Sequence, residues 1–192
     1  MPSPDGRFIA YEGKAKDGYH DTIWLEDSGT GATVDLLGPE NQRRPGAGAT
    51  EILEWLDNDR IAFTWHCGTG CTSLDIVNIK DRFHWYLCTS TWFYLSPDKQ
   101  YAVGETESQA GDIGGLALIK MEGGHRKWAD SDDCKLIFSG TGVCGDKNSD
   151  YFKFDHWEPD SRSFTYKVSH CESRIGEEGV WSRSEERVFN LK

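Results

Sequence analysis

The chain has 192 residues, with 32 acidic side chains against 21 basic ones and a formal net charge of −11. That charge repels phosphate backbones and anionic lipid, so the composition argues against a nucleic-acid or membrane-surface partner. The nearest approach to a basic patch is the single pair Arg43 and Arg44. No stretch reaches the ~20 apolar residues of a membrane span.

Short apolar runs bounded by turn residues predict β-strands from the start of the chain. After the turn SPDG come RFIAY and TIWLED, then the turn SGTG and TVDLL. The segment after WLDND repeats this order with RIAFTW, SLDIVNI and RFHWYL, and the segment after LSPDK does so with QYAVGE, GLALIKM and HRKW. The last copy follows WEPDS with SFTYKV, GVWSR and RVFNL. No window sustains a 3.6-residue period over three turns, so long helices are not expected.

A further apolar run precedes three of the four turns, as TEILEW, STWFYL and YFKFDHW. Each copy then makes a four-stranded antiparallel blade, except the first, which lacks its leading strand. We therefore predict an all-β fold, a β-propeller of four four-stranded antiparallel blades with about fifteen strands. The repeat units of this single domain, 1–192, are approximately 1–49, 50–88, 89–150 and 151–192. Three alternatives stay open: a closed four-bladed ring, an incomplete ring, and part of a larger ring, including one that a second copy completes.

The stretch SPDGRFIAY…IWLEDSGTG resembles the TolB-like, or WD-like, propeller repeat that also builds the propellers of prolyl-oligopeptidase-type peptidases. SPDKQYAV and EPDSRSFTY are similar to it, whereas LDNDRIAF lacks the proline and is one residue shorter. The resemblance implies blade architecture over most of the chain. It implies function only broadly, because such propellers include scaffold, ligand-binding and substrate-gating domains.

The even number of cysteines, six, predicts disulfides and an oxidising compartment. Spacing divides them into two close pairs and two unassigned residues: Cys67–Cys71, Cys134–Cys144, and Cys88 with Cys171. The alternative is reduced, buried thiols. We expect a periplasmic or secreted protein, with the cytoplasm as the alternative. Because no charged segment followed by an apolar run precedes Ser3, we expect the leader of an exported protein to be missing from this chain.

The long connections lie at one end of the predicted blades, opposite the short turns, and loops on a rigid scaffold often carry binding residues. The candidate ligand-binding residues there are His20, His66, His170, Glu105, Asp112, Arg43 and Arg44. The three histidines come from different repeats, so they indicate either a transition-metal site or ordinary surface histidines. Trp65, Trp92 and Trp128 stand at strand ends, as packing residues or as a stacking surface for a sugar or peptide.

The sequence contains no nucleophile elbow, phosphate-binding loop or HExxH zinc motif, and this favours a non-catalytic protein. We predict a binding or interaction propeller that holds a peptide, protein or small polar ligand on its long-loop face. No cofactor is expected, the metal question is open, and a homodimer is one way to complete the ring. The alternative is the propeller portion of an enzyme, either a peptidase-type gating domain or a hydrolase or lyase with acid–base residues on the loops.

Overall fold

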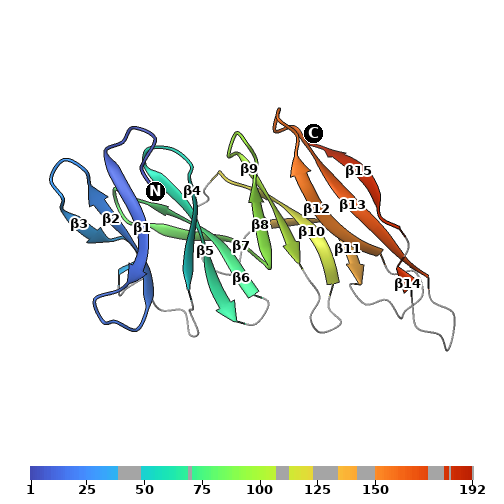
Figure 1. The fold of residues 1–192 in the computed structure, drawn as a ribbon, viewed down its shortest axis with the longest axis horizontal. Helices are drawn as coiled ribbons and strands as arrows, with labels where there is room; N and C mark the ends of the chain where they lie inside the picture. Colours follow the sequence, from blue (N-terminus) through green and yellow to red (C-terminus); the bar gives the residue numbers. More distant parts are fainter. Residues whose placement is uncertain are drawn as a thin grey trace. The chain divides into compact units, whose positions relative to one another are not determined.

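The computed structural model describes residues 1–38, 49–68, 71–106, 113–122, 134–141, 150–172, 180–181 and 183–191. Every element named in these ranges is a β-strand (Figure 1), and none is a helix able to cross a membrane. The strands are β1 (Phe8–Lys14), β2 (Asp21–Asp27), β3 (Thr33–Asp35), β4 (Thr50–Trp55), β5 (Arg60–Gly68), β6 (Cys71–Asn78), β7 (His84–Ser90), β8 (Trp92–Leu95), β9 (Tyr101–Thr106), β10 (Ile113–Lys120), β11 (Cys134–Thr141), β12 (Asp150–Trp157), β13 (Ser163–Glu172), β14 (Val180–Trp181) and β15 (Glu185–Asn190). The expected all-β architecture is confirmed.

The strands form four antiparallel sheets, each made of consecutive strands. The first sheet is β1–β2–β3, the second β4–β5–β6–β7, the third β8–β9–β10–β11, and the fourth holds β12 to β15. The first sheet has three strands, as expected from the absence of an apolar run before the first turn in the sequence. Each predicted repeat therefore supplies one sheet of the blade type from which propellers are built.

Two strand assignments in the later repeats are wrong. In the third sheet, β10 pairs with β11; the predicted strand HRKW, at 125–128, lies outside the described residues. In the fourth sheet, β14 pairs with Cys171–Glu172 and β15 pairs with Ser163–Val168, so both lie beside β13. RVFNL is therefore not a fourth strand beyond GVW. β13 has 10 residues, enough for two short partners end to end, and only residues 182–184 separate β14 from β15.

The repeated Pro/Asp motif closes the same turn in different sheets. The Ser3 hydroxyl donates to Asp5 Oδ1 at 2.7 Å and accepts from the Phe8 N–H at 2.9 Å. The third copy repeats both bonds, at 2.7 and 3.0 Å, with Ser96, Asp98 and Tyr101. A serine and an aspartate within six residues thus satisfy the turn locally, which explains why the sequence motif recurs.

The fourth residue of this turn takes the left-handed conformation in three copies. Gly6, Lys99 and Ser161 have φ values of 72°, 61° and 58°. Glycine adopts this conformation freely, whereas the two other residues are strained in it. Ser161 also accepts a hydrogen bond from the Asp98 N–H at 3.0 Å, so two of the repeated turns lie against one another.

The described residues fall into two compact units, one from Met1 to Thr89 and one starting at Ser90. Each unit has its own hydrophobic cluster. The buried residues of the first cluster are Ala10, Ile23, Leu25, Leu36, Leu37, Ile52, Trp55, Ile61, Phe63, Trp65 and Val77. Those of the second are Val103, Leu116, Phe152, Phe154, Phe164, Tyr166 and Val168. A single domain over 1–192 stays a prediction.

The four sheets differ in how many of their faces are buried. In the second sheet, residues 61–65 of β5 and 73–77 of β6 are buried without a break, so both faces are covered. In the first sheet, β1 alternates, with Ala10 buried between exposed Ile9 and Tyr11. In the fourth sheet, buried Phe152 and Phe154 alternate with exposed Lys153 and Asp155. The first and fourth sheets therefore each present one face to solvent.

Disulfides are present, but one predicted pair is wrong. Cys71, Cys88, Cys134 and Cys171 are each disulfide-bonded. Cys134 forms its disulfide with a cysteine other than Cys144, so the predicted Cys134–Cys144 pair is wrong. Cys144 itself lies outside the described residues. The side chain of Cys67 lies outside the described part, so the Cys67–Cys71 pair stays a prediction.

Candidate functional site

Several strand ends meet at one end of the first unit. Glu12, near the end of β1, accepts a hydrogen bond on Oε1 from the Ile52 N–H of β4 at 2.7 Å. The start of β4 pairs with the end of β5, where Thr50 lies opposite Trp65. The ends of β1 and β5 are therefore close together, and we call this region the loop end of the first unit. It carries the loop 15–20 and His66.

Asp17 closes the loop between β1 and β2 on itself. Its Oδ1 accepts from the N–H groups of Tyr19 and His20 at 2.9 and 3.2 Å, and its Oδ2 lies 2.6 Å from Nδ1 of the His20 ring. The Ala15 N–H donates to the His20 carbonyl at 2.8 Å. The Tyr19 N–H, followed by the His20 ring, holds the pKa of Asp17 below its usual range. The loop thus has a defined shape of its own.

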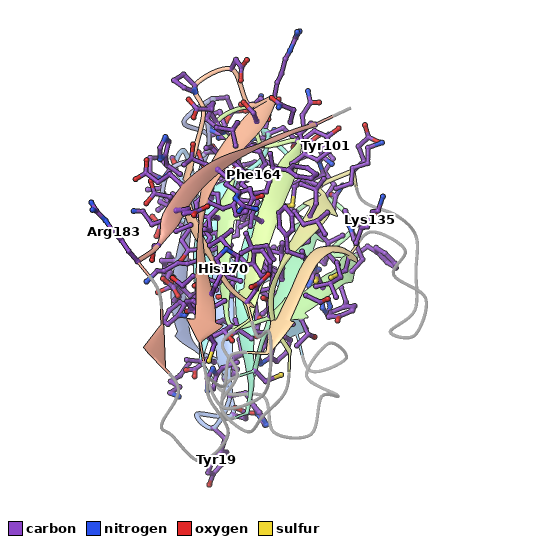
Figure 2. The ribbon with its side chains drawn as sticks, turned by 90° about the vertical axis from the view of Figure 1, so that its right-hand side faces the viewer. Tyr19, Tyr101, Lys135, Phe164, His170 and Arg183 are labelled. Carbon is purple, nitrogen blue, oxygen red and sulfur yellow. The ribbon has the colours of Figure 1, made fainter. Side chains whose placement is uncertain are left out.

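This loop projects Tyr19 into solvent. The side chain is 86% exposed, and Figure 2 shows it extending beyond the tip of its loop. Sequence reasoning missed Tyr19, although a lone aromatic in the polar stretch KAKDGYHD was a usable signal. A large ring held outward by a shaped loop is available for contact with a partner.

The predicted histidines divide between the two units. His20 and His66 both lie at the loop end of the first unit; the His66 side chain is exposed, and its N–H donates to the Ala49 carbonyl at 3.1 Å. His170 belongs to the second unit, where it lies opposite Asp150 with Nδ1 2.6 Å from Oδ1. Within the described residues no three histidine, cysteine or acidic side chains are grouped to hold a metal ion.

Glu105 has a structural role that sequence reasoning missed. It is 1% exposed, and its Oε2 accepts from the Phe154 N–H at 3.0 Å. It occupies the same repeat position in QYAVGE that Glu12 occupies in RFIAYE. Both carboxylates bind the leading strand of the following sheet immediately before a β-bulge, between Ile52 and Glu54 or between Phe154 and His156. The expectation of a solvent-facing ligand at position 105 is corrected.

Some predicted positions lie outside the described residues, namely Arg43, Arg44, Asp112 and Trp128. Trp65 is buried in the first core, whereas Trp92 is 56% exposed at the start of β8. Of the three tryptophans considered as a stacking surface, only Trp92 among those described keeps that potential.

A buried Ser–Asp–His cluster in the second sheet looks catalytic by composition but is not arranged for catalysis. Asp75 is fully buried, with Oδ2 accepting from the Ser73 hydroxyl at 2.5 Å and Oδ1 3.0 Å from His84 Nε2. The serine donates to the carboxylate rather than to the histidine, and it is buried. It therefore has neither the general base nor the access that a nucleophile needs. The cluster holds β6 to β7 inside the sheet.

The fold belongs to a class seen in several solved structures. No family model matches the sequence, and no curated protein matches it. A prolyl endopeptidase aligns with 98% of this chain at 12% identity and a TM-score of 0.55, over 28% of its own length. TolB from Acinetobacter baumannii aligns with 99% at 13% identity and a TM-score of 0.46, over 40% of its length.

The β-propeller domain of the Trilobed protease from Pyrococcus furiosus aligns with the whole chain at 12% identity and a TM-score of 0.44, over 57% of its length. The chain thus spans between 28% and 57% of these proteins. At such identities the likeness concerns the fold alone. It agrees with the sheets described above, and the resemblance to TolB-like propeller repeats is confirmed at that level.

Proposed function

We propose that the protein is a non-catalytic binding module that holds a peptide or protein segment at the loop end of its first unit. The observation that carries this proposal is Tyr19, displayed in solvent on a loop that Asp17 closes on itself. Tyrosine combines a large apolar surface with a hydroxyl, and tyrosines are enriched in protein interfaces. A loop already in its bound shape loses little conformational entropy on association.

The histidines complete this surface. The His20 ring is oriented by Asp17 beside Tyr19, and exposed His66 lies at the same end of the unit. Imidazole nitrogens donate or accept hydrogen bonds, so they suit backbone and polar side chains of a peptide. The disulfides support a periplasmic or secreted location, where thiols are oxidised.

Selection of peptides on the immobilised protein tests the proposal. A random peptide library is panned on the native chain, and the selected peptides are measured by calorimetry against the double variant Tyr19→Ser/His66→Ala. We expect affinity to fall tenfold or more at an unchanged melting temperature. Phe83→Ser is the matched control, since Phe83 is an exposed aromatic, 46% accessible, on the β6–β7 turn of the same unit. Peptides that bind the double variant and the native chain equally would move the site elsewhere.

A further inference from the structure

The outward face of the first sheet is aromatic and partly exposed. We define it by Ile9 and Tyr11 of β1 and by Trp24 and Glu26 of β2, whose neighbours Ala10, Ile23 and Leu25 point into the core. Ile9 lies opposite Glu26 and Tyr11 lies opposite Trp24. Ile9 and Tyr11 are 37% and 39% exposed. The aromatic pair Tyr11 and Trp24 thus lies next to the pair formed by the apolar Ile9 and the carboxylate of Glu26.

Gly13 and Lys14 hold the indole of Trp24 down on the sheet. A Cβ at Gly13 would lie 2.9 Å from Cδ1 of Trp24, so the ring crosses β1 where a side chain is missing. The indole N–H donates to the Lys14 carbonyl at 3.0 Å. The ring is therefore fixed in orientation before any partner arrives, which reduces the entropy cost of stacking on it.

Two carboxylates, those of Glu26 and Asp35, lie on the same face as Tyr11 and Trp24. Among the described residues no ion pair involves Glu26, whereas Asp21, at the far end of β2, is paired with Lys14 at 2.7 Å. Asp35 of β3 lies opposite Trp24 on the same face. The faces of indole and phenol rings also carry negative potential, which attracts cations. The net charge of −11 steers positively charged molecules toward the chain as a whole.

We propose that this outward face docks a basic peptide segment, with a lysine or arginine side chain lying over Trp24 and Tyr11. The aliphatic stem of that side chain packs on Ile9, as long basic side chains do on apolar surfaces. Its cationic head rests on the rings, and the negative charge of Glu26, opposite Ile9, attracts it. The chain shows the same chemistry within itself, since the Arg7 guanidinium lies 4.8 Å from the centre of the Phe8 ring.

The probe is an octa-arginine peptide, compared with a glycine–serine peptide of equal length. We expect the native chain to bind octa-arginine, to bind more weakly as salt rises, and to show a shifted Trp24 indole N–H resonance. Tyr11→Ser and Glu26→Gln, both at accessible positions, each weaken binding fivefold or more. Glu51→Gln, an exposed carboxylate on β4, is the control and leaves binding within twofold.

Gly13→Ala tests the fixed indole directly. Gly13 has no positive φ, so alanine fits the backbone, but its Cβ displaces the Trp24 ring. We expect weaker octa-arginine binding although no contacting group is removed. Equal binding by the native chain, Tyr11→Ser, Glu26→Gln and Gly13→Ala would overturn the proposal and indicate diffuse attraction to an acidic surface. Loss of self-association in these variants, without any effect on the peptide, would instead assign the face to a second copy. Phe83→Ser, which removes an exposed aromatic ring outside this face, leaves octa-arginine binding unchanged.

Discussion

Removal of the Glu105 carboxylate is expected to destabilise the second unit far more than removal of the Glu12 carboxylate, at the same repeat position, destabilises the first unit. Glu105 is 1% exposed and accepts from the Phe154 N–H inside the protein. In Glu105→Ala that N–H loses its partner where no water replaces it. Glu12 makes the same bond to Ile52 but is itself exposed, so water can take over after Glu12→Ala.

The size of the difference follows from burial. An orphaned buried N–H costs about 1–3 kcal/mol, and the one buried methylene that Glu105→Ala removes contributes about 0.8 kcal/mol. We therefore expect Glu105→Ala to lower the free energy of unfolding by about 2–4 kcal/mol. Glu12→Ala should cost about 1 kcal/mol, the typical net value of an accessible hydrogen bond. Glu105→Gln keeps an acceptor oxygen and should fall between them.

Urea unfolding followed by near-ultraviolet circular dichroism measures these free energies. Hydrogen exchange with mass spectrometry then locates the effect, because the peptide containing Phe154 should lose protection in Glu105→Ala while β4 keeps its own. If Glu105→Ala costs less than 1 kcal/mol, or no more than Glu12→Ala, the hydrogen bond to Phe154 is not what holds β12, and the argument from burial fails.

Three further outcomes are expected. Lys99→Gly should raise the free energy of unfolding by about 0.5–1 kcal/mol in the same urea assay, because relief of its left-handed backbone exceeds the added freedom of glycine in the unfolded chain. Asp75→Ala should cost about 3–5 kcal/mol, since it leaves the Ser73 hydroxyl and the His84 ring without their buried carboxylate; a cost under 1 kcal/mol would contradict this. The pKa of Asp17 is lowered by folding, so its contribution is present above the ordinary value of about 3.9 and lost as pH falls through the lower folded value. Amide shifts of Tyr19 should therefore change below about pH 4, as Asp17 is protonated, and the absence of any transition there would refute the assignment.

Features that depend on residues close in sequence could be predicted. The Ser3–Asp5 turn is complete within six residues and recurs as Ser96–Asp98, and related aspartate-containing turns marked the other two sheets. Alternation of apolar and polar residues then located most strands. The repeat also predicted His20 and His66 at one end of their unit, because the β1–β2 and β5–β6 connections occupy the same position in their repeats.

Features that depend on residues distant in sequence could not be predicted. Glu105 is buried by contacts with Phe154, 49 positions away, and nothing in QYAVGE alone separates it from a surface acid. The failed Cys134–Cys144 pair has a similar origin, since ten residues form a short loop only if no strand extends through them. Asp75 left a usable signal, because an aspartate within the apolar run SLDIVNI has to find a buried partner.

The exposed aromatic face of the first sheet is not a general property of a sheet with one free side, as the fourth sheet shows. Its outward face carries the ion pair of Lys167 with Asp155, and His156 lies 2.7 Å from the same carboxylate. The hydrogen bond between Lys167 and Asp155 lowers the pKa of the carboxyl and raises that of the amine. Both groups therefore stay charged from about pH 4 to beyond about pH 10, and removing water from them is unfavourable. The fourth sheet is thus suited to solvent, whereas Ile9 and Tyr11 on the first sheet lose unfavourable hydration when they are covered. This contrast is the physical reason to look for a partner on the first sheet and not on the fourth.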